Sequence, residues 1–236
     1  MPEVSDLENI RRNWEKVKQR VAAAAHRAGR NPEDITIVAV SKTVPVARIR
    51  AAVEAGVRHI GENRVQEAWG KFQELGRLAT WHLVGHLQTN KAKRALQFFD
   101  VIQSVDSLHL AQELERRCEQ LERDVEVLIE VKTSDEPTKF GVAPEETEHL
   151  VAAIAGMPHL HLTGLMTVGK FTPVETEVRR CFRILSELRD ELNRRAVYPQ
   201  PLHHLSMGMS GDFEWAIEEG ATIVRIGTAI FGPRSY

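Results

Sequence analysis

Apolar positions along the chain follow two patterns, short uninterrupted runs and longer segments in which every third or fourth residue is apolar. Residues 35–40 (ITIVAV) are mostly β-branched and are typical of a strand that is covered on both faces. Residues 5–28 carry apolar side chains at helical spacing and end before Gly29, which predicts an amphipathic helix. The two patterns alternate along the rest of the chain.

This alternation predicts an N-terminal helix and then eight strands, the first seven of which are each followed by a helix. The predicted strands are 35–42, 59–63, 81–86, 101–105, 125–131, 160–167, 204–209 and 223–231. The predicted helices that follow them are 45–56, 65–75, 91–98, 107–123, 144–156, 174–196 and 212–219.

Repeated strand–helix units indicate an α/β protein with a parallel sheet, and eight units suit closure into a (β/α)8 TIM barrel. The competing architecture is an open doubly wound sheet, but no G-x-G-x-x-G motif follows the first strand. No linker or change of composition marks a second domain. We therefore predict a single barrel domain over residues 1–236 with an extra helix at its N-terminus.

Composition narrows the class of protein. The chain has 236 residues, a formal net charge of -2 and 27% charged residues, which gives no electrostatic reason to expect nucleic acid or a membrane as a partner. Residues 1–6 lack the apolar core of a secretory signal, and no apolar run approaches the ~18 residues of a membrane span. Cys118 and Cys181 lack metal-type spacing. We expect a cytoplasmic protein without a metal.

Lys42 follows the first apolar run after Ser41 and lies three residues before Pro45. A lysine is rarely buried without a partner, so by itself Lys42 is better explained as a surface residue in a turn. Active sites of (β/α)8 barrels, however, gather at the C-terminal ends of the strands. Lys42 belongs to that set, as do Asn63, Asp106 and the segment 206–212.

Two glycine-containing loops strengthen the case for a site. The segment 206–212 contains Gly208, Ser210 and Gly211 just before a predicted helix, and Gly227-Thr228 lies in the eighth unit. Each glycine alone is best explained as an ordinary turn. In this barrel class, however, the loops after strands seven and eight often bind phosphate, so together they favour a phosphate cradle.

In a closed barrel the first strand lies beside the eighth, so Lys42 comes close to this cradle. A sheltered lysine with a lowered pKa can act as an amine nucleophile toward an aldehyde or ketone. The combination predicts a phosphorylated carbonyl ligand. Two candidates remain open on this basis, a sugar phosphate in a Schiff-base aldolase and pyridoxal 5'-phosphate (PLP).

Seven motifs in order along the chain resemble the pyridoxal phosphate homeostasis protein family, single-domain relatives of the alanine racemase N-terminal barrel. They are AVSKT (39–43), GEN (61–63), WH (81–82), LQTNK (87–91), GLM (164–166), LSMGMS (205–210) and VRIGTAIFG (224–232).

The resemblance implies that Lys42 holds PLP as a Schiff base. It further implies that Ser210 and the backbone of Gly227 and Thr228 hold the phosphate, and that Arg225 faces the pyridine nitrogen. The remaining implied residues are the ring neighbours Asn63 and Met207, and Lys139, a second amine near the site. The sequence departs from the family pattern at Phe140 and at Gly85-His86.

The choice between enzyme and carrier depends on Arg225 and on a second base. An arginine stays protonated and leaves the pyridine nitrogen unprotonated, which makes the ring a weak electron sink. Racemases with this barrel add a second domain, whereas this sequence ends at Tyr236, and Tyr198 is better explained as a residue at a helix end. We expect a monomeric PLP carrier with no catalytic residues that serves apo PLP-dependent enzymes. An amino-acid racemase and a Schiff-base aldolase are the alternatives.

Overall fold

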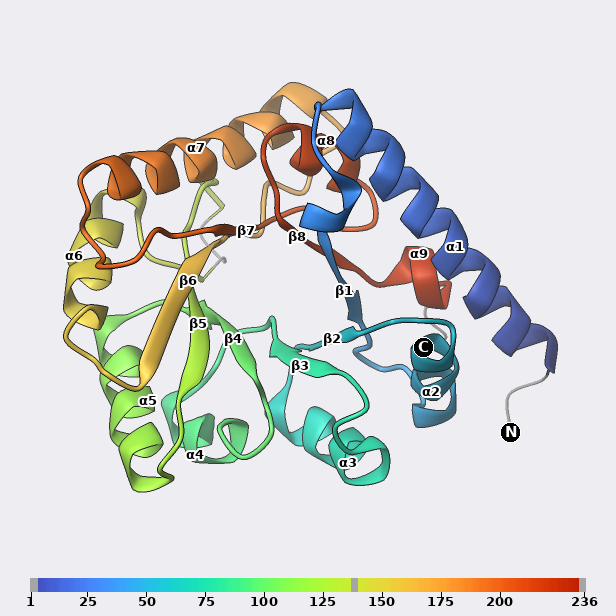
Figure 1. Ribbon diagram of the computed structural model, residues 1–236, viewed down its shortest axis with the longest axis horizontal. Coiled ribbons are helices and arrows are strands. Elements are labelled where there is room, and N and C mark those ends of the chain that lie inside the picture. Colours follow the sequence, from blue (N-terminus) through green and yellow to red (C-terminus); the bar gives the residue numbers. More distant parts are fainter. Residues whose placement is uncertain (1–3, 137–139, 234–236) are drawn as a thin grey trace.

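Eight parallel strands form a closed barrel in the order of the sequence (Figure 1). The computed structural model describes residues 4–136 and 140–233. The strands are β1 (Thr36–Val40), β2 (His59–Glu62), β3 (Thr80–Leu83), β4 (Val101–Val105), β5 (Val125–Glu130), β6 (Leu160–Met166), β7 (His204–Ser206) and β8 (Ile223–Ile226). The barrel closes where β1 pairs with β8, with Val38 opposite Arg225. The predicted (β/α)8 architecture is confirmed.

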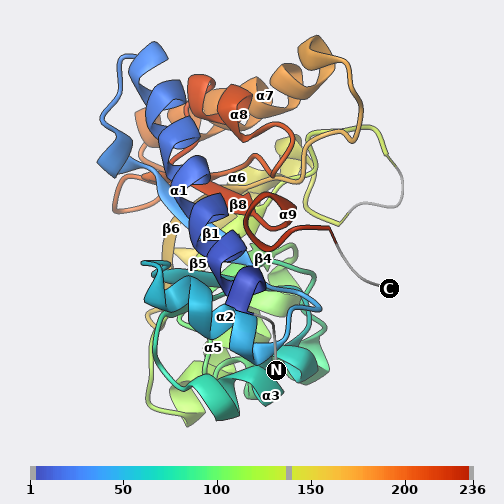
Figure 2. The ribbon, with the colours of Figure 1, turned by 90° about the vertical axis from the view of Figure 1, so that its right-hand side faces the viewer.

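The helices form the outer layer, and an additional helix covers the seam of the barrel. They are α1 (Val4–Arg27), α2 (Val46–Glu54), α3 (Val65–Leu75), α4 (Ala92–Ala95), α5 (Leu108–Gln120), α6 (Pro144–Ile154), α7 (Glu175–Arg194), α8 (Phe213–Glu218) and α9 (Thr228–Phe231). Helix α1 crosses the outside of the barrel from α8 to α2 (Figure 2). Its Trp14, Val17 and Val21 are buried, so the amphipathic pattern of the sequence faces the core.

The structure corrects the predicted end of the eighth strand. Strand β8 stops at Ile226, and Thr228–Phe231 forms helix α9 instead of continuing the strand to Phe231. The backbone turns at Gly227, and the amide groups of Ile230 and Phe231 donate to the Gly227 carbonyl oxygen. Short apolar runs do not distinguish a strand from a buried helical turn, which explains the error.

Several other predicted strands also end earlier than expected, among them β3, which ends at Leu83 instead of residue 86. Strand β1 ends at Val40, two residues before Lys42, and β7 ends at Ser206 instead of residue 209. The predicted helix over 91–98 is the short helix α4. With α9 after β8, every strand, including the eighth, leads into a helix.

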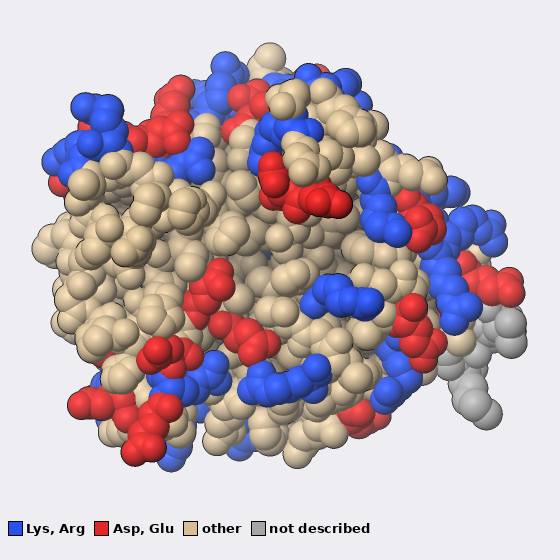
Figure 3. Space-filling model, viewed as in Figure 1, with Lys and Arg blue, Asp and Glu red and all other residues tan. Residues whose placement is uncertain are grey.

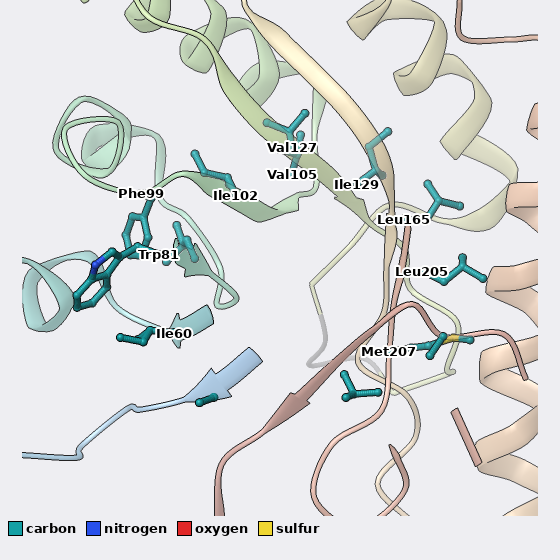
Figure 4. Close-up of a cluster of buried hydrophobic side chains, with 14 of the residues drawn as sticks. Ile60, Trp81, Phe99, Ile102, Val105, Val127, Ile129, Leu165, Leu205 and Met207 are labelled. Atoms are coloured by element: carbon teal, nitrogen blue, oxygen red, sulfur yellow. The ribbon is translucent and has the colours of Figure 1, made fainter. Parts of the chain in front are cut away.

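Most of the apolar core lies between the barrel and its helices. Large buried side chains such as Trp81, Phe99 and Ile102 point outward from the strand layer (Figure 4). A separate, smaller cluster fills the barrel interior. Its buried members are Val38, Val101, Leu128, Met166 and Ile223.

Polar side chains inside the barrel form one chain of hydrogen bonds. Arg225 Nη1 donates to Ser206 Oγ over 2.7 Å, and Ser206 Oγ donates to Gln103 Oε1 over 2.6 Å. Gln103 Nε2 lies 3.0 Å from His82 Nδ1, and His82 Nε2 lies 3.0 Å from His59 Nδ1. Because the Gln103 oxygen accepts, its amide nitrogen donates to His82, which must then carry its proton on Nε2 and donate to His59.

This arrangement requires a neutral His82. Burial, together with smaller contributions from the neighbouring His59 and His204, lowers the pKa of His82 from 6.5 to about 3. A protonated His82 would have no acceptor to offer Gln103, and the hydrogen-bonded chain below Arg225 would break. The chain of hydrogen bonds in the barrel interior therefore fixes the position of Arg225.

The His82 pKa predicts a specific loss of stability in acid. As pH falls from about 6.5 toward 3, the unfolded chain takes up the His82 proton before the folded chain does. The free energy of unfolding contributed by this residue therefore falls by up to about 1.4 kcal/mol per pH unit in that range. We expect His82→Gln, which offers an acceptor and a donor but cannot titrate, to show a flatter pH dependence in urea unfolding.

The comparison with wild type isolates His82. The buried Glu130 has the opposite pH dependence. Burial raises its pKa to about 7, so the free energy of unfolding that it contributes falls as pH rises. Glu130 is present in both proteins and its effect cancels in the comparison. His59 and His204, whose pKa values burial also lowers, are shared as well. Equal slopes for the two proteins between pH 6.5 and 3 would contradict a neutral, buried His82.

Candidate functional site

A cavity of about 490 Å³ opens at the C-terminal ends of the strands. Six of the seven residues predicted from the sequence line it, and they come from loops far apart along the chain. They are Lys42, Asn63, Ser210, Arg225, Gly227 and Thr228. The barrel topology therefore brings the predicted lysine and both predicted loops to one place.

Lys42 lies in a turn between β1 and α2. The amide of Val44 donates to the carbonyl oxygen of Ser41 over 2.9 Å, which closes the turn around Lys42 and Thr43. Thr43 has a φ of 62°, a left-handed conformation that a β-branched residue rarely adopts. The lysine is half-buried and lines the cavity, so it is both a turn residue and a site residue.

The loops after β7 and β8 meet at Ser210. The amide groups of Gly227 and Ala229 point toward Ser210 Oγ, at nitrogen–oxygen distances of 3.2 and 3.3 Å. A Cβ atom on Gly227 would lie 3.2 Å from the carbonyl oxygen of Val40, so a larger residue would crowd β1. Converging backbone amides beside a hydroxyl suit the oxygens of a phosphate group.

Gly208 shapes the first of these loops. Its φ of 89° suits glycine, and a Cβ atom there would lie 2.5 Å from the Cβ of Ala216. The loop can therefore pack closely against α8. Beyond it, the Met209 amide donates to Asp212 Oδ1 over 2.5 Å, which holds Ser210 at the cavity.

Arg225 is a fixed cation in the floor of the cavity. Its Nη1 donates to Ser206 and its Nη2 donates to the carbonyl oxygen of Thr167 over 2.7 Å. Burial lowers its pKa to about 10, while the carboxylates of Glu130 and Asp212 favour the charged form. Arg225 therefore remains protonated at neutral pH and presents donors only.

Met207 differs from the expectation that it would be a neighbour of the ligand ring. Its side chain is fully buried in the core outside the barrel, near Leu205 (Figure 4), and it does not line the cavity. Met209 lines the cavity instead. The alternation of a strand does not extend beyond Ser206, where β7 ends, so it cannot be used to orient either methionine.

The other residues considered from the sequence either lie outside the described part of the chain or do not line the cavity. Lys139 and Tyr236 lie outside the described residues. The Tyr198 hydroxyl accepts from the Leu162 amide and lies 3.4 Å from the Leu160 carbonyl oxygen, so it anchors the loop before β7 to β6. Cys118 and Cys181 are both buried and free.

Sequence reasoning missed the loop after β6, which forms one wall of the cavity. Lys170, Phe171, Thr172 and Pro173 all line it, and Phe171 is 91% exposed. The signal was available, because this loop leaves the C-terminal end of β6, where barrel sites gather. It contains Gly169 and the hydroxyl residue Thr172, but no cluster of glycines and serine like that of 206–212 that would have singled it out.

The two departures from the family pattern lie side by side. The ring of Phe140 stacks on His86 with centroids 3.9 Å apart and planes 10° from parallel. His86 Nδ1 also lies 2.9 Å from Asp106 Oδ2. Neither residue lines the cavity, so the departures occur together and away from the predicted site residues.

The described part of the chain offers no group of three or more His, Cys, Asp or Glu side chains placed to hold a metal ion. Within the same residues, no helix has the length and apolar character needed to cross a membrane. The cavity is instead suited to an organic ligand, because it combines an amine, a fixed cation and a cluster of hydrogen-bond donors.

Known proteins resemble the chain along nearly its full length. The model of the alanine racemase N-terminal domain family matches residues 5–235. A pyridoxal phosphate homeostasis protein of Aquifex aeolicus is 45% identical over 222 residues, which cover 94% of this chain and 96% of that protein. The protein of the same name in Escherichia coli K12 is 41% identical over 235 residues, which cover 98% of this chain and 99% of the relative.

A solved structure agrees with these relatives. PipY of Synechococcus elongatus, with PLP bound, has a TM-score of 0.81 and 37% sequence identity, and the match covers 92% of this chain and all of that one. The fold, the full-length sequence match and the arrangement of the cavity point the same way. The chain belongs to the alanine racemase N-terminal domain family and, within it, to the pyridoxal phosphate homeostasis proteins.

Proposed function

We propose that this protein binds PLP through a Schiff base on Lys42 and stores or delivers it in vitamin B6 homeostasis, with little or no catalysis. The observation that carries the proposal is the meeting of Lys42, the Ser210 cradle and Arg225 in one cavity. The relatives named for pyridoxal phosphate homeostasis and the PLP-bound PipY support it.

The cavity fits each part of the cofactor. Ser210 and the amides of Gly227, Thr228 and Ala229 supply donors for the phosphate, and Arg225 supplies a donor for the ring nitrogen. The neutral amine of Lys42 attacks the aldehyde carbon, a C=N bond replaces the C=O bond, and water leaves. Bound in this way, PLP would supply an imine carbon at which one amine can replace another, and a ring that can accept electrons.

Arg225 favours a carrier over a racemase. Racemisation needs a ring that stabilises a carbanion, which a protonated pyridine nitrogen does best. The Arg225 guanidinium, with a pKa of about 10, remains charged and cannot supply that proton at neutral pH. The side chain therefore binds the ring without activating it.

Among the described residues, the other titratable side chains that line the cavity already have hydrogen-bond or ion-pair partners. Lys170 Nζ lies 2.7 Å from Glu177 Oε2, and Asp212 accepts the Met209 amide. The Tyr198 hydroxyl is hydrogen-bonded to the backbone of β6 and does not line the cavity. This supports the carrier, because a racemase needs one base on each side of the substrate carbon.

Replacing Lys42 tests the covalent linkage. We expect Lys42→Ala to lose the visible absorbance band of a lysine–PLP adduct and to release PLP on dialysis, because only the non-covalent contacts remain. Lys93→Ala, on the exposed side of α4, is the matched control and should stay yellow. A wild-type protein that stays colourless with added PLP contradicts the proposal and leaves the sugar-phosphate aldolase as the alternative.

Replacing Ser210 tests the phosphate cradle. Ser210→Ala removes a hydroxyl from a charged ligand, and such hydrogen bonds contribute about 1.5–3 kcal/mol. We expect the affinity for PLP to fall roughly tenfold or more in equilibrium dialysis. The affinity for pyridoxal, which lacks the phosphate, should not change. Equal losses for both ligands would place the phosphate elsewhere.

Turnover and transfer distinguish the carrier from the racemase. We expect the loaded protein to restore an apo PLP-dependent enzyme and to change the chiral purity of L-amino acids more slowly than the roughly 1 per second typical of enzymes. Chiral chromatography and a recovery assay against free PLP give the two measurements. Racemisation at enzymatic rates would establish the alternative, and recovery no different from that with free PLP would remove the delivery role.

A further inference from the structure

A buried ion cluster lies beneath the turn that carries Lys42. It consists of Glu62 at the end of β2 and of Glu67 and Lys71 on α3. Lys71 Nζ lies 2.6 Å from the carbonyl oxygen of Ser41, 2.7 Å from Glu62 Oε1 and 2.7 Å from Glu67 Oε1. These three acceptors satisfy the three hydrogens of the ammonium group.

The cluster holds the residues on both sides of Lys42. Before it, Ser41 accepts from Lys71 through its carbonyl oxygen, and its hydroxyl donates to Glu62 Oε1 over 2.5 Å. After it, the amide of Thr43 donates to Glu67 Oε1 over 2.5 Å. The backbone that leads into Lys42 and the backbone that leaves it are therefore fixed by one group of charges.

The turn needs this support. Thr43 has a φ of 62°, and a conformation of this kind is strained for a β-branched residue and persists only where the surroundings enforce it. The Glu67 carboxylate, bound to the Thr43 amide, supplies one such restraint. Without it the turn can relax, and the Lys42 side chain would then project into the cavity from a different point on its wall.

Burying the charges of this cluster between α3 and the barrel costs desolvation free energy, which apolar side chains in the same place would not. The Glu62 side chain is fully buried and that of Lys71 is 10% exposed. Glu62 Oε2 has no hydrogen-bond partner, and burial raises the pKa of Glu62. Apolar residues of similar size often match or exceed a buried ion pair in stability, so stability alone does not account for these charges.

We propose that Lys71, together with Glu62 and Glu67, positions Lys42 for covalent capture of the aldehyde. The three are positioning residues, because their contacts are with the turn and none lines the cavity. The inference rests on the proposed function, since it takes Lys42 as the amine that captures PLP. It concerns a different step, the placement of that amine relative to a ligand held by the cradle.

A pair of ligands separates positioning from a merely structural role. Pyridoxine 5'-phosphate has the ring and phosphate of PLP but an alcohol in place of the aldehyde, so it binds without the covalent step. If Lys42 is no longer positioned, only the affinity for PLP falls. If the cradle or the fold is damaged, the affinities for both ligands fall together.

The test uses the full chain with Lys71→Met, which keeps the length of the side chain but removes its charge. We expect the preference for PLP over pyridoxine 5'-phosphate to fall by at least ~10-fold, the equivalent of about 1.4 kcal/mol, with the affinity for pyridoxine 5'-phosphate unchanged. Borohydride reduction followed by mass analysis of the Lys42 peptide should show slower trapping. Lys18→Met, an exposed lysine paired with Glu15 on α1, is the control.

A second variant guards against simple unfolding. Lys71→Met leaves Glu62 buried without its cation, whereas Glu62→Gln combined with Lys71→Met leaves a neutral pair that still lacks the donor to Ser41. We expect this double variant to recover stability in urea unfolding but not the preference for PLP. Recovery of both would overturn the inference.

The remaining outcomes are distinct. If wild type traps no PLP on Lys42, the proposed function fails, and the inference fails with it. If wild type traps PLP and both variants trap it equally fast, the proposed function stands and the positioning role is overturned. Parallel losses for PLP and pyridoxine 5'-phosphate also overturn it.

Discussion

The site depends on the pairing of β1 with β8. These strands lie at opposite ends of the described chain, and their parallel register places Val38 beside Arg225 and Ala39 beside Ile226. Two residues beyond each strand, the chain reaches Lys42 on one side and Thr228 on the other. Gly227 allows the close approach, because a Cβ atom there would lie 3.2 Å from the Val40 carbonyl oxygen. Helix α1 then covers this seam from outside (Figure 2).

Charged side chains on the surface and those in the interior are arranged differently. On the face shown in Figure 3, acidic and basic side chains are interspersed and form no large patch of one sign. The buried charges, by contrast, have defined tasks. Arg225 is held above Ser206, and Lys71 is held below Ser41. Both donate hydrogen bonds to neighbouring oxygens, which lowers the cost of burying their charge.

The sequence predicted the barrel because short segments rich in apolar residues alternate with amphipathic helical patterns along the chain. The parallel order then placed Lys42, Ser210 and Arg225 at one end. Orientation beyond a strand end could not be predicted, and for this reason Met207 was expected in place of Met209. The Lys71 cluster was also missed. Glu67 and Lys71 are four residues apart on a helix, a spacing that usually indicates an exposed pair, and only the tertiary fold brings Glu62 to it.

The one-way order of the interior hydrogen bonds has a consequence for protons. Arg225 only donates, Ser206, Gln103 and His82 each accept from one neighbour and donate to the next, and His59 accepts at the end of the chain. To reset after passing a proton, such a chain must reverse, and reversal requires Arg225 to accept a hydrogen bond, which a guanidinium cannot do. This hydrogen-bonded chain therefore does not relay protons through the barrel interior. A ligand in the cavity cannot gain or lose a proton by way of this chain.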